Sequence, residues 1–235
     1  MIVLITPTYN ERANIEEFVR RVFSLGLKDF CMVIVDDNSP DGTGIRADEL
    51  SRRYPIRVIH RAGPRGLGAA YSEAFQTVLS VYPEARFIIQ MDADLSHDPG
   101  DIARLLEKAR EYGLVLGSRY IPGGGVKNWG LARRIISRFG CFYSRVILGL
   151  PYHDLTGGFK CWRREALALV PFGSLSSIGY NFQIETTYWA HRGGARICEV
   201  PIVFYERKEG TSKFHAGIII ESLIKVVRLR LFGGK

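Results

Sequence analysis

The stretch Phe87-Ile-Ile-Gln-Met-Asp-Ala-Asp94 joins a short apolar run to two aspartates that are two residues apart. The apolar run predicts a strand over residues 87–91, which ends at the first aspartate. Ligand sites of open α/β sheets lie outside the carboxyl ends of the strands. Asp92 and Asp94 therefore stand where a bound group is expected, and two carboxylates suit a hard cation that also binds phosphate oxygens.

Strand and helix signals alternate on both sides of this stretch. Helices of ten or more residues between short strands imply parallel βαβ units. We therefore predict an α/β fold with a mostly parallel, Rossmann-like sheet flanked by helices. The predicted strands are residues 2–6, 32–35, 57–60, 87–91 and 114–117, and the predicted helices are residues 14–25, 43–54, 66–81 and 99–112.

The second half of the chain has a less regular pattern. We expect a glycine-rich loop at 121–125, helices at 131–148, 163–170 and 182–191, a turn at 156–159 and a strand at 197–204. A chain of 235 residues, 46% of them hydrophobic, is long enough to bury one core without disulfides.

The four cysteines are scattered and form no CxxC pair. We expect reduced, mostly buried thiols in a cytosolic compartment, because a free cysteine behaves as a small hydrophobe. The chain opens on an apolar strand that is too short for a signal peptide. No run reaches the roughly 18 to 20 apolar residues that span a bilayer, so we expect the catalytic body to lie in water.

The net charge of +8 is unevenly distributed. Residues 119–146 hold six basic and no acidic residues. Such a cluster favours an anionic partner, which could be a phosphate, a lipid headgroup or a nucleic acid; the alternative is an ordinary solvated surface.

Acidic loops follow three of the predicted strands. Thr6-Pro-Thr-Tyr-Asn-Glu11 follows the first, Asp36-Asp37 the second and Asp92-Ala93-Asp94 the fourth. Because parallel strands end at one edge of the sheet, we expect the three loops to form one site. The competing interpretation is that Asp92 and Asp94 only cap the helix that begins near Pro99.

The three loops resemble the signature blocks of the family 2 glycosyltransferases with the GT-A fold. Further blocks are similar to the polyprenol-phosphate (dolichol-phosphate) mannose synthases within that family. These blocks are Gly66-Leu-Gly68, Gly117-Ser-Arg-Tyr120, Asp154-Leu-Thr-Gly-Gly-Phe159, Gly179-Tyr-Asn-Phe-Gln-Ile-Glu185 and Arg207-Lys-Glu-Gly-Thr-Ser-Lys213. The similarity runs from residue 2 to about residue 213.

The resemblance implies transfer of mannose from GDP-mannose to a polyprenyl (dolichyl) monophosphate, with inversion and with Mg²⁺ or Mn²⁺. It assigns metal binding to Asp92, Asp94 and Ser96, acceptor-phosphate binding to Arg119, Arg133 and Ser137, and catalysis to Asp94, Arg119 and Arg133. The donor-nucleotide residues that it implies are Pro7, Tyr9, Glu11, Val35, Asp37, Asp92, Ala93, Asp94, Arg207 and Lys213.

Ser96 departs from the family pattern, which commonly has glutamine at that position. Ser96 could approach a metal directly or through water. His97 beside it is interpreted as a structural hydrogen-bonder. No general base is needed, because a lipid phosphate is already an anion at neutral pH, whereas a hydroxyl acceptor would have to lose a proton. Arginine suits such an acceptor, since guanidinium binds phosphate through two hydrogen bonds.

Residues 214–232 carry apolar positions interrupted by a stripe of Glu221, Ser222, Lys225 and Arg228. This pattern predicts an amphipathic helix. We expect residues 1–213 to form the catalytic domain and residues 214–235 an element that either lies at a membrane interface or packs on the domain's own sheet. The protein would then act peripherally on the cytoplasmic face of a membrane, where it could bind a small membrane subunit.

Three alternatives remain at this point. A related enzyme could use UDP-glucose or another sugar nucleotide on the same lipid phosphate. A basic nucleic-acid-binding domain is disfavoured, because clustered carboxylates repel a phosphate backbone. A catalytically inactive scaffold is disfavoured because the full set of acidic and basic site residues is present.

Overall fold

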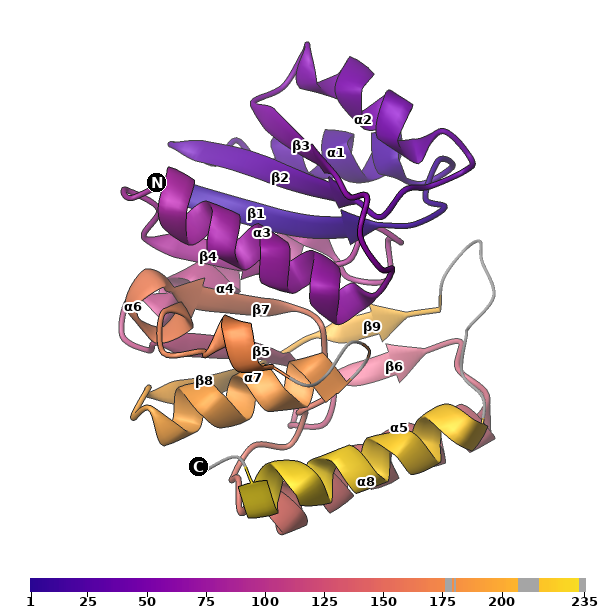
Figure 1. The fold of residues 1–235 in the computed structure, drawn as a ribbon, viewed down its shortest axis with the longest axis vertical. Coiled ribbons are helices and arrows are strands. Elements are labelled where there is room, and N and C mark those ends of the chain that lie inside the picture. Colours follow the sequence, from indigo (N-terminus) through magenta and orange to yellow (C-terminus); the bar gives the residue numbers. More distant parts are fainter. Residues whose placement is uncertain (176–178, 180, 207–215, 233–235) are drawn as a thin grey trace.

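A mostly parallel sheet forms the centre of the molecule in the computed structural model, which describes residues 1–175, 179, 181–206 and 216–232. Within these residues, seven strands pair in the order β3-β2-β1-β4-β7-β5-β8 (Figure 1). A separate parallel pair joins β6 and β9. The strands are β1 (Ile2–Thr8), β2 (Phe30–Asp36), β3 (Ile56–His60), β4 (Phe87–Gln90), β5 (Leu114–Ser118), β6 (Gly125–Lys127), β7 (Lys160–Arg163), β8 (Ile197–Pro201) and β9 (Val203–Tyr205).

Helices cover both faces of the sheet. They are α1 (Ile15–Phe23), α2 (Thr43–Ser51), α3 (Leu67–Val81), α4 (Ile102–Ala109), α5 (Leu131–Leu148), α6 (Arg164–Leu167), α7 (Asn181–Arg192) and α8 (Ala216–Phe232), with 3₁₀ turns at Pro99–Asp101 and Phe172–Ser174. Alternate strand residues face opposite sides: Val3 and Ile5 pack in the same core cluster as residues of α3 and α7, whereas Leu4 packs with α1, α2 and α4. This two-sided burial explains the apolar strand sequences and confirms the predicted α/β fold.

The sheet differs from the prediction at β7. This strand lies between β4 and β5 and is antiparallel to both. Its sequence, Lys160-Cys-Trp-Arg163, has no alternating pattern and begins with a charged residue. Residues 160–163 form a strand only because they pair with strands that are distant in the sequence. The helix predicted over 163–170 therefore begins after β7 and is limited to α6.

The strand predicted over 197–204 is divided between two sheets. β8 pairs with β5 and ends at Pro201, whereas β9 pairs with β6, which begins within the predicted glycine-rich loop. Between them, the Ile202 amide still donates to the Ser118 carbonyl at 2.9 Å. Proline lacks an amide hydrogen, so it marks the natural end of the first strand.

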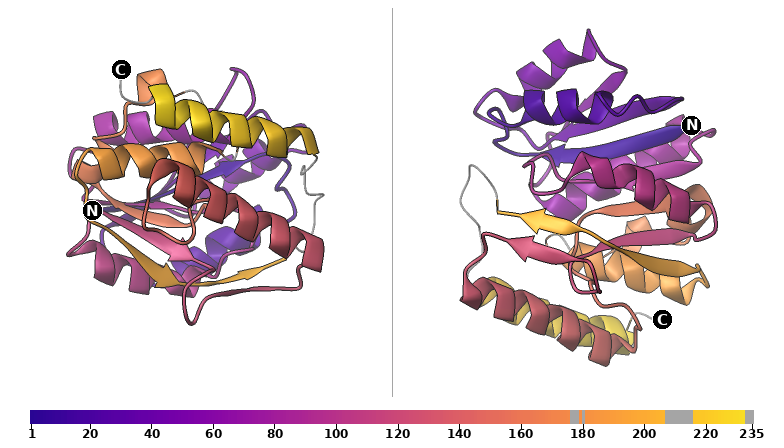
Figure 2. Two further views of the ribbon diagram at one scale, coloured as in Figure 1. Left: turned by 90° about the horizontal axis from the view of Figure 1, so that it is seen from below. Right: turned by 180° about the vertical axis from the view of Figure 1, so that it is seen from behind.

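The helices α5 and α8 lie side by side, at the opposite end of the molecule from β1–β3 (Figures 1 and 2). α8 contacts α5 and α7; the Tyr143 hydroxyl donates to the Leu223 carbonyl at 3.2 Å. The helix therefore packs on the domain through α5 and α7, and its Val226 belongs to the core cluster on that face of the sheet. Within the described part of the chain, no helix is long and apolar enough to cross a bilayer.

The cysteines agree with the sequence analysis. All four are free thiols; Cys31, Cys141 and Cys161 are buried, and Cys198 is half-buried. Burial raises the pKa of the Cys31, Cys141 and Cys198 thiols to about 11. These groups therefore pack as small hydrophobic side chains.

Candidate functional site

The carboxyl ends of β1, β2 and β4 meet at one edge of the sheet. Thr8 of β1 aligns with Asp36 of β2, and Ile5 of β1 aligns with Gln90 of β4. The loop after each of these strands holds a non-glycine residue with positive φ: Asn10 (61°), Asn38 (56°) and Leu95 (60°). A left-handed backbone is rare for leucine, and such strain concentrates at functional sites.

The three loops line one cleft of about 540 Å³. Its wall includes most of the residues predicted to bind the donor nucleotide: Pro7, Tyr9, Glu11, Asp37, Asp92, Ala93 and Asp94. Val35 does not line the cleft, because its side chain is fully buried within β2. Arg207 and Lys213 lie outside the described residues.

Two arginines support the cleft, and the sequence analysis assigned a role to neither. Arg61 is buried and pairs with Asp37, whose second oxygen accepts the Gly66 amide at 2.8 Å. Arg65 donates to the Tyr9 hydroxyl at 2.7 Å and lies 4.7 Å from the centre of the Tyr9 ring. The glycine-rich turn between β3 and α3 thus places a cation beside Tyr9 at the cleft wall.

The aspartate pair is held by neighbouring hydroxyl groups. The Tyr71 hydroxyl donates to Asp92 Oδ1 at 2.9 Å, and Ser96 donates to Asp94 Oδ1 through Oγ at 2.5 Å and through its amide at 3.1 Å. Asp98, rather than either member of the pair, caps the turn at Pro99 and accepts the Gly100 amide at 2.9 Å. The interpretation of Asp92 and Asp94 as helix caps is therefore wrong.

The donor set of this loop fits a hard divalent cation. Asp92 and Asp94 line the cleft with oxygen ligands, and Asp94 is only 2% exposed. Across the described residues, no group of three or more His, Cys, Asp or Glu side chains is placed to hold a metal. A cation here would therefore need oxygens from a bound phosphate as well, which is how Mg²⁺ is usually held. Ser96 is fully buried against Asp94 and does not line the cleft.

His97 is not the structural hydrogen-bonder that the sequence analysis expected. Within residues 1–175, 179, 181–206 and 216–232, neither ring nitrogen has a hydrogen-bond partner. The centre of the ring lies 5.1 Å from that of Phe159 and 5.0 Å from that of Phe204. Burial lowers the pKa of His97, which keeps its imidazole neutral. The ring therefore acts as packing between the two aromatic side chains.

Arg119 is buried and paired, rather than exposed to solvent. Its Nε and Nη2 donate to the two oxygens of Asp154, each at 2.7 Å, and Nη2 also donates to Thr156 Oγ1 at 2.9 Å. Burial alone would raise the pKa of the Asp154 carboxyl, but the charge and hydrogen bonds of Arg119 outweigh it and lower that pKa. Nη1 of Arg119 has no hydrogen-bond partner within the described part of the chain, so it is available to a ligand.

Arg133 and Ser137 follow on α5, one turn apart. Arg133 pairs with Glu206 and stacks 4.1 Å from the centre of the Trp129 ring. Ser137 Oγ accepts the Tyr120 hydroxyl at 2.6 Å. All three predicted acceptor residues thus line the same space, although the two arginines already have carboxylate partners.

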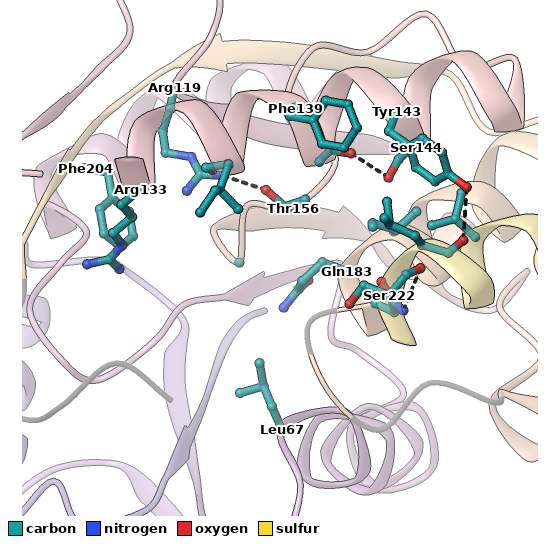
Figure 3. A pocket seen from close by; sticks show the side chains of 18 of the residues that line it. Leu67, Arg119, Arg133, Phe139, Tyr143, Ser144, Thr156, Gln183, Phe204 and Ser222 are labelled. Atoms are coloured by element: carbon teal, nitrogen blue, oxygen red, sulfur yellow. Dashed lines mark hydrogen bonds between the residues drawn. The ribbon is translucent and has the colours of Figure 1, made fainter. Parts of the chain in front are cut away.

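That space is a second cavity of about 160 Å³, enclosed by α5, α7, α8 and the loop before β7 (Figure 3). Arg119 and Arg133 lie at one end of it (Figure 3), Ser137 is also part of its wall, and most of the wall is apolar. Four residues line both this cavity and the cleft at the sheet edge: Leu67, Asp92, Asn181 and Ser222. The two spaces therefore meet at the aspartate loop.

Comparisons with known proteins agree with this geometry. The model of the family "Glycosyl transferase family 2" matches residues 3–169. The chain is 42% identical over 235 residues to the polyprenol monophosphomannose synthase of Mycolicibacterium smegmatis, covering 98% of this chain and 87% of that protein. It is 40% identical to the undecaprenyl-phosphate mannosyltransferase of Micrococcus luteus, covering 97% and 93%. Identity to the dolichol-phosphate mannosyltransferase of Pyrococcus furiosus is 34%, covering all of this chain and 65% of that protein.

Solved structures share the fold at much lower identity. Glucosyl-3-phosphoglycerate synthase from Mycobacterium tuberculosis, in complex with Mn²⁺ and UDP-glucose, superimposes with a TM-score of 0.71 at 20% identity, covering 98% of this chain and 78% of that one. The same enzyme in complex with Mg²⁺ and UDP gives a TM-score of 0.71 at 19% identity, covering 98% and 79%. The arrangement of sheet and helices is thus that of the GT-A fold.

Proposed function

The chain belongs to glycosyl transferase family 2, and on that premise we propose that it transfers mannose from GDP-mannose to a polyprenyl monophosphate, with inversion at the anomeric carbon. The observation that carries this proposal is the pair of spaces that meet at Asp92: an acidic cleft at the sheet edge, and a largely apolar cavity with arginines at one end. The names of the mannosyltransferase relatives support the choice of sugar and acceptor.

The donor would occupy the cleft between the loops after β1, β2 and β4. Asp92 and Asp94 would hold Mg²⁺ or Mn²⁺ together with the donor diphosphate. The bound cation would stabilise the negative charge that develops on the leaving diphosphate. Tyr71 and Ser96 fix one oxygen of each carboxylate, so this chain presents the pair in one orientation.

The acceptor would bring its phosphate to Arg119 and Arg133. Asp154 holds the Arg119 guanidinium in place, which leaves Nη1 as the donor to a phosphate oxygen. Arg133 would exchange Glu206 for the phosphate, because a phosphate offers the guanidinium a stronger anionic partner. The acceptor oxygen is already ionised, so no side chain has to remove a proton.

The proposal is tested with purified protein, labelled GDP-mannose, MgCl₂ or MnCl₂ and a polyprenyl phosphate, followed by organic extraction of the product. Label in the lipid phase supports it. Transfer from UDP-glucose without transfer from GDP-mannose would show that the chain is the related glucosyltransferase. A polyprenol without phosphate serves as the matched negative acceptor.

Arg133→Ala should mainly weaken use of the acceptor. We expect KM for polyprenyl phosphate to rise roughly tenfold or more, because a hydrogen bond to a charged group contributes about 1.5–3 kcal/mol, whereas KM for GDP-mannose should change little. Steady-state kinetics with each substrate varied in turn would check this. Arg110→Ala, exposed at the end of α4 and away from α5 and α8, is the control. A larger effect on the donor KM would contradict the assignment of Arg133.

We propose further that residues 214–235, together with α5, hold the catalytic domain (1–213) at a membrane surface, on its cytoplasmic face. Exposed apolar side chains form a stripe along α5, and α8 adds others beside it; they are Leu131, Ile135, Phe139, Phe142 and Val146, and Ile224, Val227 and Leu231. Arg134, Arg138, Arg228 and Arg230 are exposed on the same two helices. Apolar side chains rimmed by arginines suit an interface with anionic lipid, and a small membrane subunit could bind there too.

The double variant Phe142→Ser, Val146→Ser should bind vesicles containing anionic lipid roughly tenfold or more weakly than the wild type, because burying one large apolar side chain contributes about 1.5–3 kcal/mol. Phe142 and Val146 are 63% and 59% exposed, so the fold should tolerate the change. Vesicle flotation measures the bound fraction. Ile45→Ser is the control, since Ile45 is 67% exposed on α2. Equal flotation of all three proteins would show that this face does not contact the membrane.

A further inference from the structure

Hydrogen bonds that link three side chains fix the orientation of the Gln183 amide in the first turn of α7. The Trp162 indole Nε1 donates to Gln90 Oε1 at 3.2 Å, and Gln90 Nε2 donates to Gln183 Oε1 at 2.6 Å. An indole N–H can only donate, so the direction of both amides follows from it. The Gln183 amide must therefore present its NH₂ group, and not its oxygen, on the remaining side.

That NH₂ group is buried and has no hydrogen-bond partner among the residues that the structure describes. Gln183 is only 1% exposed, and its side chain points into the open centre of the second cavity, between Leu67 and the arginine end (Figure 3). A buried donor without a partner is unfavourable by about 1–3 kcal/mol, and such groups are rare in native proteins. A bound polar group would satisfy it.

Asn181 lies two residues earlier and has the opposite polarity. Its Nδ2 donates to the Ser222 carbonyl at 3.3 Å, and a carbonyl can only accept. Its Oδ1 is therefore an acceptor, and this atom is buried without a partner in the described part of the chain. Asn181 is 7% exposed and lines both the donor cleft and the second cavity.

The absence of a side chain at Gly158 leaves room beside the Gln183 amide. A Cβ built on Gly158 would lie 3.2 Å from Asp92 Oδ2 and 3.5 Å from Gln183 Nε2. The space next to Gly158 is thus bordered by the diphosphate-binding aspartate on one side and by the Gln183 donor on the other. The sugar of a nucleotide sugar must lie there, because the anomeric carbon has to face both the diphosphate and the acceptor.

Buried contacts hold the first turn of α7 rigidly. Lys160 of β7 is fully buried and donates through Nζ to the Gln183 carbonyl at 2.7 Å and to Thr187 Oγ1 at 2.9 Å. Burial lowers the pKa of Lys160 to about 7. A side chain positioned by such contacts loses little entropy when it binds a ligand.

We propose that Gln183 and Asn181 recognise the transferred hexose, with the Gln183 NH₂ donating to one sugar hydroxyl and Asn181 Oδ1 accepting from another. Hydroxyl groups can both donate and accept, so a fixed donor and a fixed acceptor that line one cavity select a hexose by the positions of its hydroxyls. The inference rests on the proposed function, because it requires a nucleotide sugar in the cleft. It adds two substrate-binding residues for which the sequence analysis proposed no role.

The test compares Gln183→Met with the wild type on three quantities. We expect kcat/KM for GDP-mannose to fall roughly 10- to 100-fold, since a buried polar partner is lost, whereas inhibition by GDP, which lacks the sugar, stays within about twofold. KM for the polyprenyl phosphate should not change. Thermal unfolding and the exposed Gln76→Met variant serve as controls for folding and for the substitution itself.

Deoxy analogues of GDP-mannose then identify the contact. The wild type should discriminate against at least one monodeoxy analogue, and Gln183→Met should lose that discrimination, as a double-mutant cycle requires for two groups that interact. Gln183→Glu, which still accepts from Gln90 but offers no amide donor, should lose it too. If Gln183→Met does not fold, Gln183→Glu alone tests whether the Gln183 amide contacts the sugar.

Three outcomes would overturn the inference: GDP inhibition that weakens in parallel with donor use, an effect confined to the acceptor KM, or unchanged discrimination among the deoxy analogues in both variants. Wild-type transfer is measured first. If the wild type uses another nucleotide hexose, the proposed donor is wrong, and the same comparison is made with that donor and its free nucleotide. If no nucleotide hexose is used, the proposed function fails and the inference fails with it.

Discussion

Asp94→Asn is expected to lower the rate of mannosyl transfer roughly a thousandfold, a loss comparable to removing one group that stabilises the transition-state charge. The amide keeps the shape of the carboxylate but removes the charge that would hold the divalent cation. Asp94 is 2% exposed, and the Ser96 amide and hydroxyl already donate to its Oδ1. An asparagine oxygen can accept these same bonds, so the fold should persist.

The measurement is transfer as a function of MgCl₂ and MnCl₂ concentration, together with thermal unfolding. Asp98→Asn is the matched control, because Asp98 lies in the same loop but caps the turn at Pro99, where asparagine serves equally well. We expect that control to retain its activity. A rate for Asp94→Asn near that of the wild type, with either metal, would contradict the assignment of Asp94 to the cation.

Asp154→Ala should destabilise the fold by about 3–5 kcal/mol, because it leaves the Arg119 charge buried without its partner. The pair is among the most buried in the described chain: Asp154 is 0% and Arg119 7% exposed at the side chain. Urea unfolding at neutral pH measures the difference. The double variant Arg119→Met, Asp154→Leu should recover most of the loss in stability, since replacing both members of a buried pair with apolar residues is often neutral.

The pH dependence of this effect has a definite sign. The folded-state pKa of Asp154 is lowered from its ordinary value of 3.8, so the unfolded chain binds the proton more readily. The contribution of the Arg119–Asp154 pair to the free energy of unfolding is therefore complete above pH 3.8. It is lost as the pH falls through the folded-state pKa of Asp154. The stability difference between the wild type and Asp154→Ala should shrink in strong acid, and equal differences at neutral and acidic pH would contradict this account.

Much of the fold followed from local patterns. Apolar strands and amphipathic helices alternate through the first 118 residues, and each predicted element there is present within a few residues of its expected ends. The exposed and buried sides of α5 could not be assigned from the pattern alone, because the cavity and the proposed membrane face both need apolar side chains. The surface that we propose to face the membrane is formed by α5 together with α8. The two helices are distant in the sequence, since α5 begins at Leu131 and α8 at Ala216.

The sequence by itself determined where the acidic loops lie, which we propose to be the donor half of the site. Asp92 and Asp94 follow a strand, parallel strands end at one edge, and the motif therefore had to lie beside the loops after β1 and β2. Only the tertiary structure decided how the buried polar groups around the second cavity are paired. Asp154, Gln90 and Gln183 are far apart in the chain, and the β7 strand that helps to bring them together carries no strand pattern of its own. Local periodicity predicts which face of a helix or strand is buried. The hydrogen-bond partner of a buried polar group, in contrast, depends on how elements distant in the sequence pack together.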